Sequence, residues 1–152
     1  MSRATRVLEI NQPPSIISKT LLDANNIGKW SPTVVSSTCS EESLKEGTNF
    51  SLKEDMKKIG GPKFEADIVV EKLTDKEIVW RQVQGPMKKL KWHFELSPTE
   101  KGTLLRLTID YDMPYSVMGA LLDKLKMNRV IGDAIQMNLE GLKRKVESDR
   151  LT

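Results

Sequence analysis

Few side chains in this sequence could carry out catalysis by themselves. The single histidine, His93, shares the polar side of a strand-like segment with Lys91 and Glu95, which favours a surface position over a catalytic one. The single cysteine, Cys39, has no evident neighbouring base to activate it as a nucleophile. No Gly-rich phosphate loop and no HExxH or GxSxG motif occurs. One cysteine and one histidine cannot form a zinc site alone, so we expect no metal and no cofactor, and we assign no catalytic residue.

A second set of polar residues lies among apolar ones on the inward side of strand-like segments. These residues are Glu54, Gln82, Gln84 and Tyr111. A few polar groups in an apolar wall are typical of a site for an amphipathic ligand. We favour this interpretation for Gln82 and Tyr111, whereas Glu54 and Gln84 are expected at the rim of the sheet, where they reach water.

The hydrophobic pattern predicts the elements that must position these residues. A first strand at 3–10 is followed by two short helices near 14–21 and 25–30. Period-two alternation then continues to Met113, and short turn signals divide it into six segments. Such connections make neighbouring strands antiparallel, with one packed face and one solvated face. The predicted strands are 34–40, 48–58, 63–73, 77–84, 87–97 and 103–113.

The C-terminal segment, from Val117 to about Ser148, predicts the long helix that covers this sheet. The apolar residues of this segment are spaced by alternating steps of four and three positions, and the same steps place Asn128 and Gly132 in the middle of the apolar face. Two explanations stay open: a cavity with Asn128 as one of its polar groups, or a close approach of Trp80 or Trp92 to Gly132 with Asn128 in solvent. The stripe consists of Leu121, Leu125, Ile135, Leu139, Leu142 and Val146.

The composition is that of a globular protein, and 152 residues predict one domain over 1–152. No apolar run reaches the roughly 18 residues of a membrane span, and no signal sequence follows Met1, so we expect a cytoplasmic protein. The 24 basic and 21 acidic residues leave a net charge of +3, unlike a dedicated nucleic-acid binder.

Two groups of basic residues could bind a partner other than a small molecule. If they converge, they could meet an acidic protein, RNA or, transiently, an anionic membrane surface, although a solvated cationic face is the favoured interpretation. The oligomeric state does not follow from the sequence. The two groups are Lys88, Lys89 and Lys91, and Lys124, Lys126 and Arg129.

The order of elements resembles the helix-grip fold of the START-like (SRPBCC) superfamily, and within it the polyketide cyclase/dehydrase and lipid-transport branch. The resemblance implies an α+β fold, with a curved antiparallel sheet of about six or seven strands wrapped around a long C-terminal helix. It also implies a cavity for lipids, sterols, polyketides or other apolar molecules. The residues that carry it are 10–14, 23–32, Gly47-Thr48, 78–81, Gly102-Thr103, Tyr111 with Pro114, and 139–147.

The sequence therefore predicts non-catalytic binding or transport of a hydrophobic or amphipathic small molecule (lipid-, polyketide- or quinone-like) between the sheet and the C-terminal helix. Alternatives are a polyketide cyclase-like enzyme, in which only Glu54 and Tyr111 could titrate, and an interaction module that uses the basic residues. The candidate ligand-binding residues are Trp80, Gln82, Trp92, Phe94, Ile109, Tyr111, Met113, Met118, Leu121, Leu125, Asn128 and Gly132.

Overall fold

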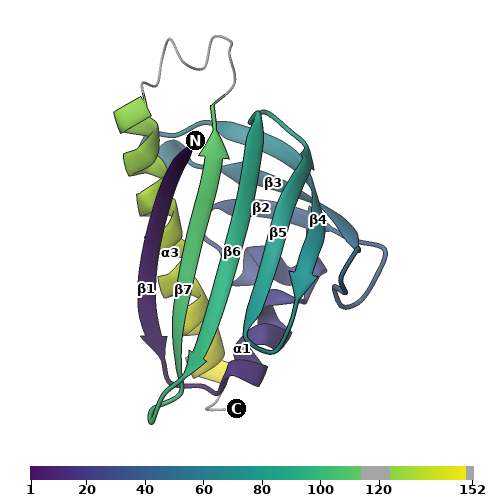
Figure 1. The fold of residues 1–152 in the computed structure, drawn as a ribbon, viewed down its shortest axis with the longest axis vertical. Coiled ribbons are helices and arrows are strands. Elements are labelled where there is room, and N and C mark those ends of the chain that lie inside the picture. Colours follow the sequence, from purple (N-terminus) through teal and green to yellow (C-terminus); the bar gives the residue numbers. More distant parts are fainter. Residues whose placement is uncertain (114–123, 150–152) are drawn as a thin grey trace.

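Seven antiparallel strands form one sheet that curls around a C-terminal helix (Figure 1). The computed structural model describes residues 1–113 and 124–149. The strand order is β1-β7-β6-β5-β4-β3-β2, so the first and last strands of the chain lie side by side at one side of the sheet. The elements are β1 (Ser2–Ile10), α1 (Pro14–Leu21), η1 (Ala24–Lys29), β2 (Val34–Thr38), β3 (Asn49–Asp55), η2 (Lys57–Ile59), β4 (Lys63–Leu73), β5 (Glu77–Gln84), β6 (Lys89–Pro98), β7 (Thr103–Asp112) and α3 (Lys124–Asp149).

The predicted helix-grip α+β architecture is confirmed. Most predicted strand bounds agree with the structure to within two residues. The exception is the segment 48–58, where β3 ends at Asp55 and the chain turns into η2. Gly60 then adopts a positive φ of 84°, which favours glycine, and lets the chain reverse into β4. None of the described helices is long and apolar enough to cross a membrane.

The inward face of α3 differs from the predicted one in its first half. Leu125 is 84% exposed, so its predicted inward position is wrong. Asn128 is exposed as well, which agrees with the explanation that puts it in solvent and not with the one that makes it a polar group of the cavity. Four-residue steps back from Ile135 reach Ile131 and Met127, both buried, because a pitch of 3.6 residues permits either a three- or a four-residue step. Within the described residues of α3, 124–149, the apolar stripe therefore has no gap.

Gly132 is buried, but on another side of the helix. A Cβ atom there would lie 2.6 Å from Nη2 of Arg6 on β1, so the missing side chain makes room for a guanidinium group. Neither Trp80 nor Trp92 is among its nearest atoms. The prediction that Gly132 opens space toward the sheet aromatics is wrong, because α3 presents this position to the edge strand.

A close contact between α3 and the segment after η1 brings polar side chains of the two segments together. A Cβ atom at Gly141 would collide with the carbonyl oxygen of Trp30 and would also meet Pro32. The absence of a side chain thus lets the helix approach this segment closely. Asn138, about one turn earlier on α3, is thereby brought to Ser31.

Candidate functional site

A cavity of about 40 Å³ lies between the inner face of the sheet and α3. A cavity needs about 10–15 Å³ to hold a water molecule, so this conformation has room for a few waters. All three tryptophans of the chain line it, and most other lining side chains are apolar. The lining residues are Ile27, Trp30, Ser31, Val34, Leu52, Glu54, Met56, Phe64, Trp80, Met87, Leu90, Trp92, Phe94, Leu107, Ile109, Ile131, Ala134 and Asn138.

Strand register places the aromatic wall of the cavity. Trp80 on β5 is paired with Trp92 on β6, which is paired in turn with Ile109 on β7. The Trp80 ring also packs edge-on against Phe94, with ring centroids 4.8 Å apart, and against Phe50, with centroids 5.1 Å apart. Such edge-to-face contacts fix ring positions in addition to burying apolar area. The wall is therefore a packed row across three central strands.

Three polar side chains line the cavity: Ser31, Glu54 and Asn138. Together with the buried Thr33, which is hydrogen-bonded to them, they form a group that we call the inner polar cluster. The Thr33 hydroxyl donates to Oε1 of Glu54 over 2.8 Å. Nδ2 of Asn138 donates to Oγ1 of Thr33 (3.1 Å) and to the carbonyl oxygen of Ala134 (2.8 Å). The Ser31 hydroxyl donates to Oδ1 of Asn138. The hydrogen bonds thus run in one direction and end on the Glu54 carboxylate.

Local structure explains how these groups meet. Thr33 precedes β2, and its carbonyl oxygen accepts a hydrogen bond from the backbone N–H of Asp55 at the end of β3. Glu54 is paired with Val34 in the β2–β3 ladder. Alternation along β3 then turns Glu54 to the same side as Leu52, into the cavity lining.

The environment of Glu54 changes its acidity. Burial raises the pKa of its carboxyl group from 4.5 to about 7, and the hydrogen bond from Thr33 offsets this only in part. Among the described residues that line the cavity, none is a lysine, arginine or histidine that could compensate the charge. Glu54 can therefore act as a hydrogen-bond acceptor or, near neutral pH, as a proton donor.

Two of the tryptophans that line the cavity carry an indole N–H group without a hydrogen-bond acceptor among the described residues. Nε1 of Trp30 and Nε1 of Trp80 are both buried, and no described atom accepts a hydrogen bond from either. Both residues line the cavity. A buried donor without an acceptor costs about 1–3 kcal/mol. The lining side chains therefore include one acceptor, Glu54, and two donors that have no partner within the described part of the chain.

Four of the predicted site residues line the cavity: Trp80, Trp92, Phe94 and Ile109. The rim position favoured for Glu54 is wrong, since its side chain lies in the cavity wall. Gln84, by contrast, is exposed, as expected. Alternation along β3 carried the signal for Glu54, whereas no pattern identified Ser31, Thr33 or Asn138, because their contact depends on how α3 approaches the chain after η1.

The remaining predicted residues lie elsewhere. The amide of Gln82 donates to the carbonyl oxygen of Met87 (2.7 Å) and so braces the turn between β5 and β6. The Tyr111 hydroxyl donates to Oδ1 of Asn128 (3.0 Å), and burial raises the pKa of that phenol above its usual value. Met113 packs against the core. Met118 and Leu121 lie outside the described residues.

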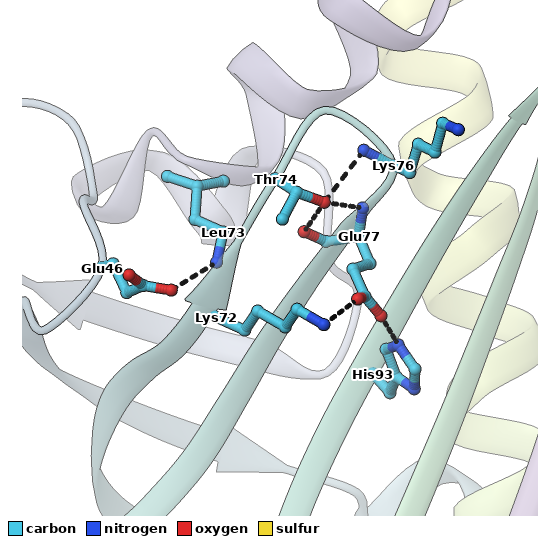
Figure 2. Close-up of polar contacts among 7 residues, drawn as sticks. All are labelled: Glu46, Lys72, Leu73, Thr74, Lys76, Glu77 and His93. Carbon is cyan, nitrogen blue, oxygen red and sulfur yellow. Dashed lines mark hydrogen bonds and ion pairs between the residues drawn. The ribbon is translucent and has the colours of Figure 1, made fainter.

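The outer face of the sheet carries a contrasting group (Figure 2) that we call the outer polar cluster: Lys72, Thr74, Glu77 and His93. Nε2 of His93 is 2.6 Å from Oε2 of Glu77, and Lys72 forms an ion pair with the other oxygen of Glu77. The predicted surface position of His93 is confirmed. It is bound to a carboxylate on the solvated face, away from the cavity lining.

The predicted basic groups lie near one end of the molecule. Lys89 starts β6, beside the end of β7, and Lys124 starts α3 at the same end of the ribbon (Figure 1). Lys91 is already engaged with Glu71 on β4, at 2.9 Å between Nζ and Oε2. A partner for this surface stays a prediction.

Comparison with known proteins agrees with the fold and gives the family. Residues 1–147 match the family described as polyketide cyclase / dehydrase and lipid transport. A protein from Thermus thermophilus is similar in structure, with a TM-score of 0.82, 17% identity, and 97% of this chain and 99% of that chain covered. A search of curated proteins gave no match.

Two further solved structures show the same fold at low sequence identity. A START superfamily protein from Mycobacterium smegmatis has a TM-score of 0.79 at 16% identity, with 99% of each chain covered. The Zhui aromatase/cyclase from Streptomyces sp. R1128 has a TM-score of 0.75 at 14% identity, covering 96% of this chain and 93% of that chain. With the match over 1–147, the chain belongs to the polyketide cyclase/dehydrase and lipid-transport family of the START-like (SRPBCC) superfamily.

Proposed function

We propose that this protein binds a hydrophobic or amphipathic small molecule between the sheet and α3 and does not transform it. The observation that carries the proposal is the cavity itself, an aromatic and aliphatic lining interrupted by one polar cluster. Such a site shields the apolar body of a ligand, while a few polar groups set its orientation. Trp80, Trp92, Phe94 and Ile109 would contact the apolar body.

Ligand binding has to enlarge the cavity. A benzene-sized ligand occupies an engineered cavity of about 150 Å³, well above the 40 Å³ found here. Two lining residues, Met56 and Met87, have unbranched side chains that adapt to irregular space. Met56 also begins the segment 56–62, where a Cβ atom on Gly61 would come within 2.6 Å of Val130 on α3. We propose that the ligand enters between this segment and α3.

A cyclase is the second candidate, and one observation favours it. Glu54 is a carboxyl group with a pKa of about 7 inside an apolar cavity, which suits general acid–base catalysis near neutral pH. The surrounding Ser31, Thr33 and Asn138 are neutral and could only orient a substrate by hydrogen bonds. Because no second ionisable group lines the cavity among the described residues, we rank binding above catalysis.

Native mass spectrometry of freshly purified protein, followed by organic extraction, tests the proposal. We expect a stoichiometric adduct of an apolar molecule. Incubation of the extracted molecule with fresh protein should return it unchanged, whereas a cyclised product would establish the second candidate. Protein that carries no adduct and takes up no apolar compound would contradict both.

A cavity-filling variant locates the site. Ala134 lines the cavity from α3 and is buried, so Ala134→Leu should occupy the space and reduce ligand occupancy at least about tenfold. Asp133→Leu adds the same side chain at the neighbouring exposed position and should leave occupancy unchanged. Equal occupancy in the two variants would place the ligand elsewhere.

A further inference from the structure

We infer that the ligand buries an uncharged hydroxyl group, as an alcohol or phenol does, and that this hydroxyl binds Glu54. A ligand with a buried carboxylate or phosphate would be rejected. The inference rests on the proposed function, because it requires the cavity to be occupied. It adds the chemical class of the ligand's polar group, because apolar lining residues cannot distinguish one polar group from another.

The charges in the cavity argue against an anionic ligand. Glu54 is the only ionisable side chain among the described lining residues. When Glu54 is ionised, as it is at about pH 8, a second anion beside it would lose its hydration without gaining a counter-ion, which costs several kcal/mol for a buried ion. Burial already raises the pKa of Glu54 to about 7, so even the native carboxylate is poorly compensated.

The hydrogen bonds identify which protein group remains available. Nδ2 of Asn138 is used by Thr33 and Ala134, and its Oδ1 receives the Ser31 hydroxyl. The single hydroxyl hydrogen of Thr33 goes to Glu54. Glu54 receives no other hydrogen bond from the described residues, although a carboxylate offers about four acceptor positions. A ligand donor would therefore meet Glu54 rather than Asn138.

The indole N–H groups of two tryptophans require a hydrogen-bond acceptor. The N–H groups of Trp30 and Trp80 are buried in side chains that line the same cavity and lack an acceptor among the described atoms. An ammonium group could donate to Glu54 but could not accept from an indole. An ether could accept but could not donate. A hydroxyl group does both, so it is the simplest polar group that satisfies both unused capacities.

Matched aromatic probes test the inference on the full chain. Naphthalene, 2-naphthol, 2-naphthoate and 2-naphthylmethylamine share one ring system and differ in the polar group. Titrations at about pH 8 can follow tryptophan fluorescence, because all three tryptophans line the cavity. We expect 2-naphthol to bind about tenfold more tightly than naphthalene, which corresponds to one charge-assisted hydrogen bond, and 2-naphthoate to bind more weakly than naphthalene.

Two variants of one residue connect the preference to Glu54. Glu54→Leu should lower the affinity for 2-naphthol to that for naphthalene, whose own affinity should not fall. Glu54→Gln keeps an oxygen acceptor at the same position and should retain a preference of about threefold for the alcohol. A preference that survives Glu54→Leu would overturn the role of Glu54.

The probe series separates this inference from the proposed function. Equal affinities for naphthalene and 2-naphthol would overturn the inference and leave the binding function standing. Tighter binding of 2-naphthoate, or of the amine, would likewise overturn it by showing selection of an anion or a cation. If none of the four probes binds, both the inference and the proposed function are contradicted.

Discussion

Two glutamates on opposite faces of the same sheet show how the surroundings determine what a carboxylate can do. Glu54 lies on the inner face, where its described hydrogen-bond partner is the neutral hydroxyl of Thr33, and burial raises its pKa to about 7. Glu77 lies on the outer face, where Lys72 and His93 hold its pKa below the usual range. The outer carboxylate is thus satisfied by its neighbours, whereas the inner one retains the capacity to bind a ligand.

The contrast also separates stability from function. The contacts of Glu77 are partly accessible to solvent, and ion pairs at such surface positions contribute about 1 kcal/mol or less. Glu54 is expected to destabilise the empty protein at neutral pH, because the folded state holds its charge in an apolar cavity. A residue that lowers the stability of the empty protein is a candidate for function, and three experiments test this difference between the two glutamates.

The largest expected effect is the pH dependence of Glu54. Its pKa is raised on folding, so its stabilising contribution is complete below 4.5 and is lost as the pH rises through about 7. Between about pH 5 and pH 8, the unfolding free energy should fall on the order of 3 kcal/mol through this group. Glu54→Gln should remove that slope and be the more stable protein at about pH 8, as measured by chemical denaturation.

Glu71→Gln on the same outer face serves as the control for this experiment, because the ion-pair partners of Glu71 are Lys91 and Arg81, which keep their charge over the range compared. The pKa of Glu71 is lowered, first of all by the hydrogen bond from Lys91, so its contribution is lost only at acidic pH, below that range. The difference between wild type and this variant should stay constant from about pH 5 to pH 8. Equal slopes in wild type and Glu54→Gln would show that Glu54 is hydrated like Glu77, and the contrast between the two faces would fail.

The sequence predicted the sheet well because each strand carries its own alternation and its own turn signals. Residues 63–73 and 77–84, for example, are strands in both the prediction and the structure. The same alternation put Trp80, Trp92, Phe94 and Ile109 on the inner face, and all four line the cavity. Information about these residues is local, so one sequence is sufficient.

The helix face and the polar cluster could not be obtained in the same way. Steps of three and four residues are both compatible with a helix, so the stripe could include Gly132 or Ile131, and only contact with the sheet decides between them. Ser31, Thr33 and Asn138 meet because Gly141 lets α3 approach Trp30. That contact joins segments more than 100 positions apart and leaves no periodic signal.

A smaller effect is expected when Glu54 loses its hydrogen-bond donor. Thr33→Val keeps the shape of the side chain and removes the hydroxyl that binds Oε1 of Glu54. The loss should cost about 1–2 kcal/mol of unfolding free energy at about pH 8, where the carboxylate is charged, and less at about pH 5. It should also raise the pKa of Glu54 further, which shifts the pH midpoint of the slope upward.

Thr74→Val provides the matched change in the outer polar cluster. Thr74 accepts hydrogen bonds from the backbone N–H groups of Lys76 and Glu77 in the exposed β4–β5 turn. Water can replace these bonds, so a loss of about 1 kcal/mol or less, equal at both pH values, is expected. If the loss of unfolding free energy in Thr74→Val depended on pH, or if the loss in Thr33→Val did not, the predicted pH sensitivity of the inner face would be contradicted.

The smallest expected effect is that of Lys72→Met in the outer polar cluster. Lys72 pairs with Glu77 at a position where both side chains are accessible to solvent. The substitution should cost less than about 1 kcal/mol at low ionic strength, and about 1 M NaCl should abolish the difference because the screening length falls to about 3 Å. The effect of Glu54→Gln should change little with salt, since its origin is the lack of hydration rather than a distant charge. If about 1 M NaCl instead abolished the stability change of Glu54→Gln as well, the raised pKa of Glu54 would have to come from nearby anions. The cavity would then contain more water than its apolar lining indicates.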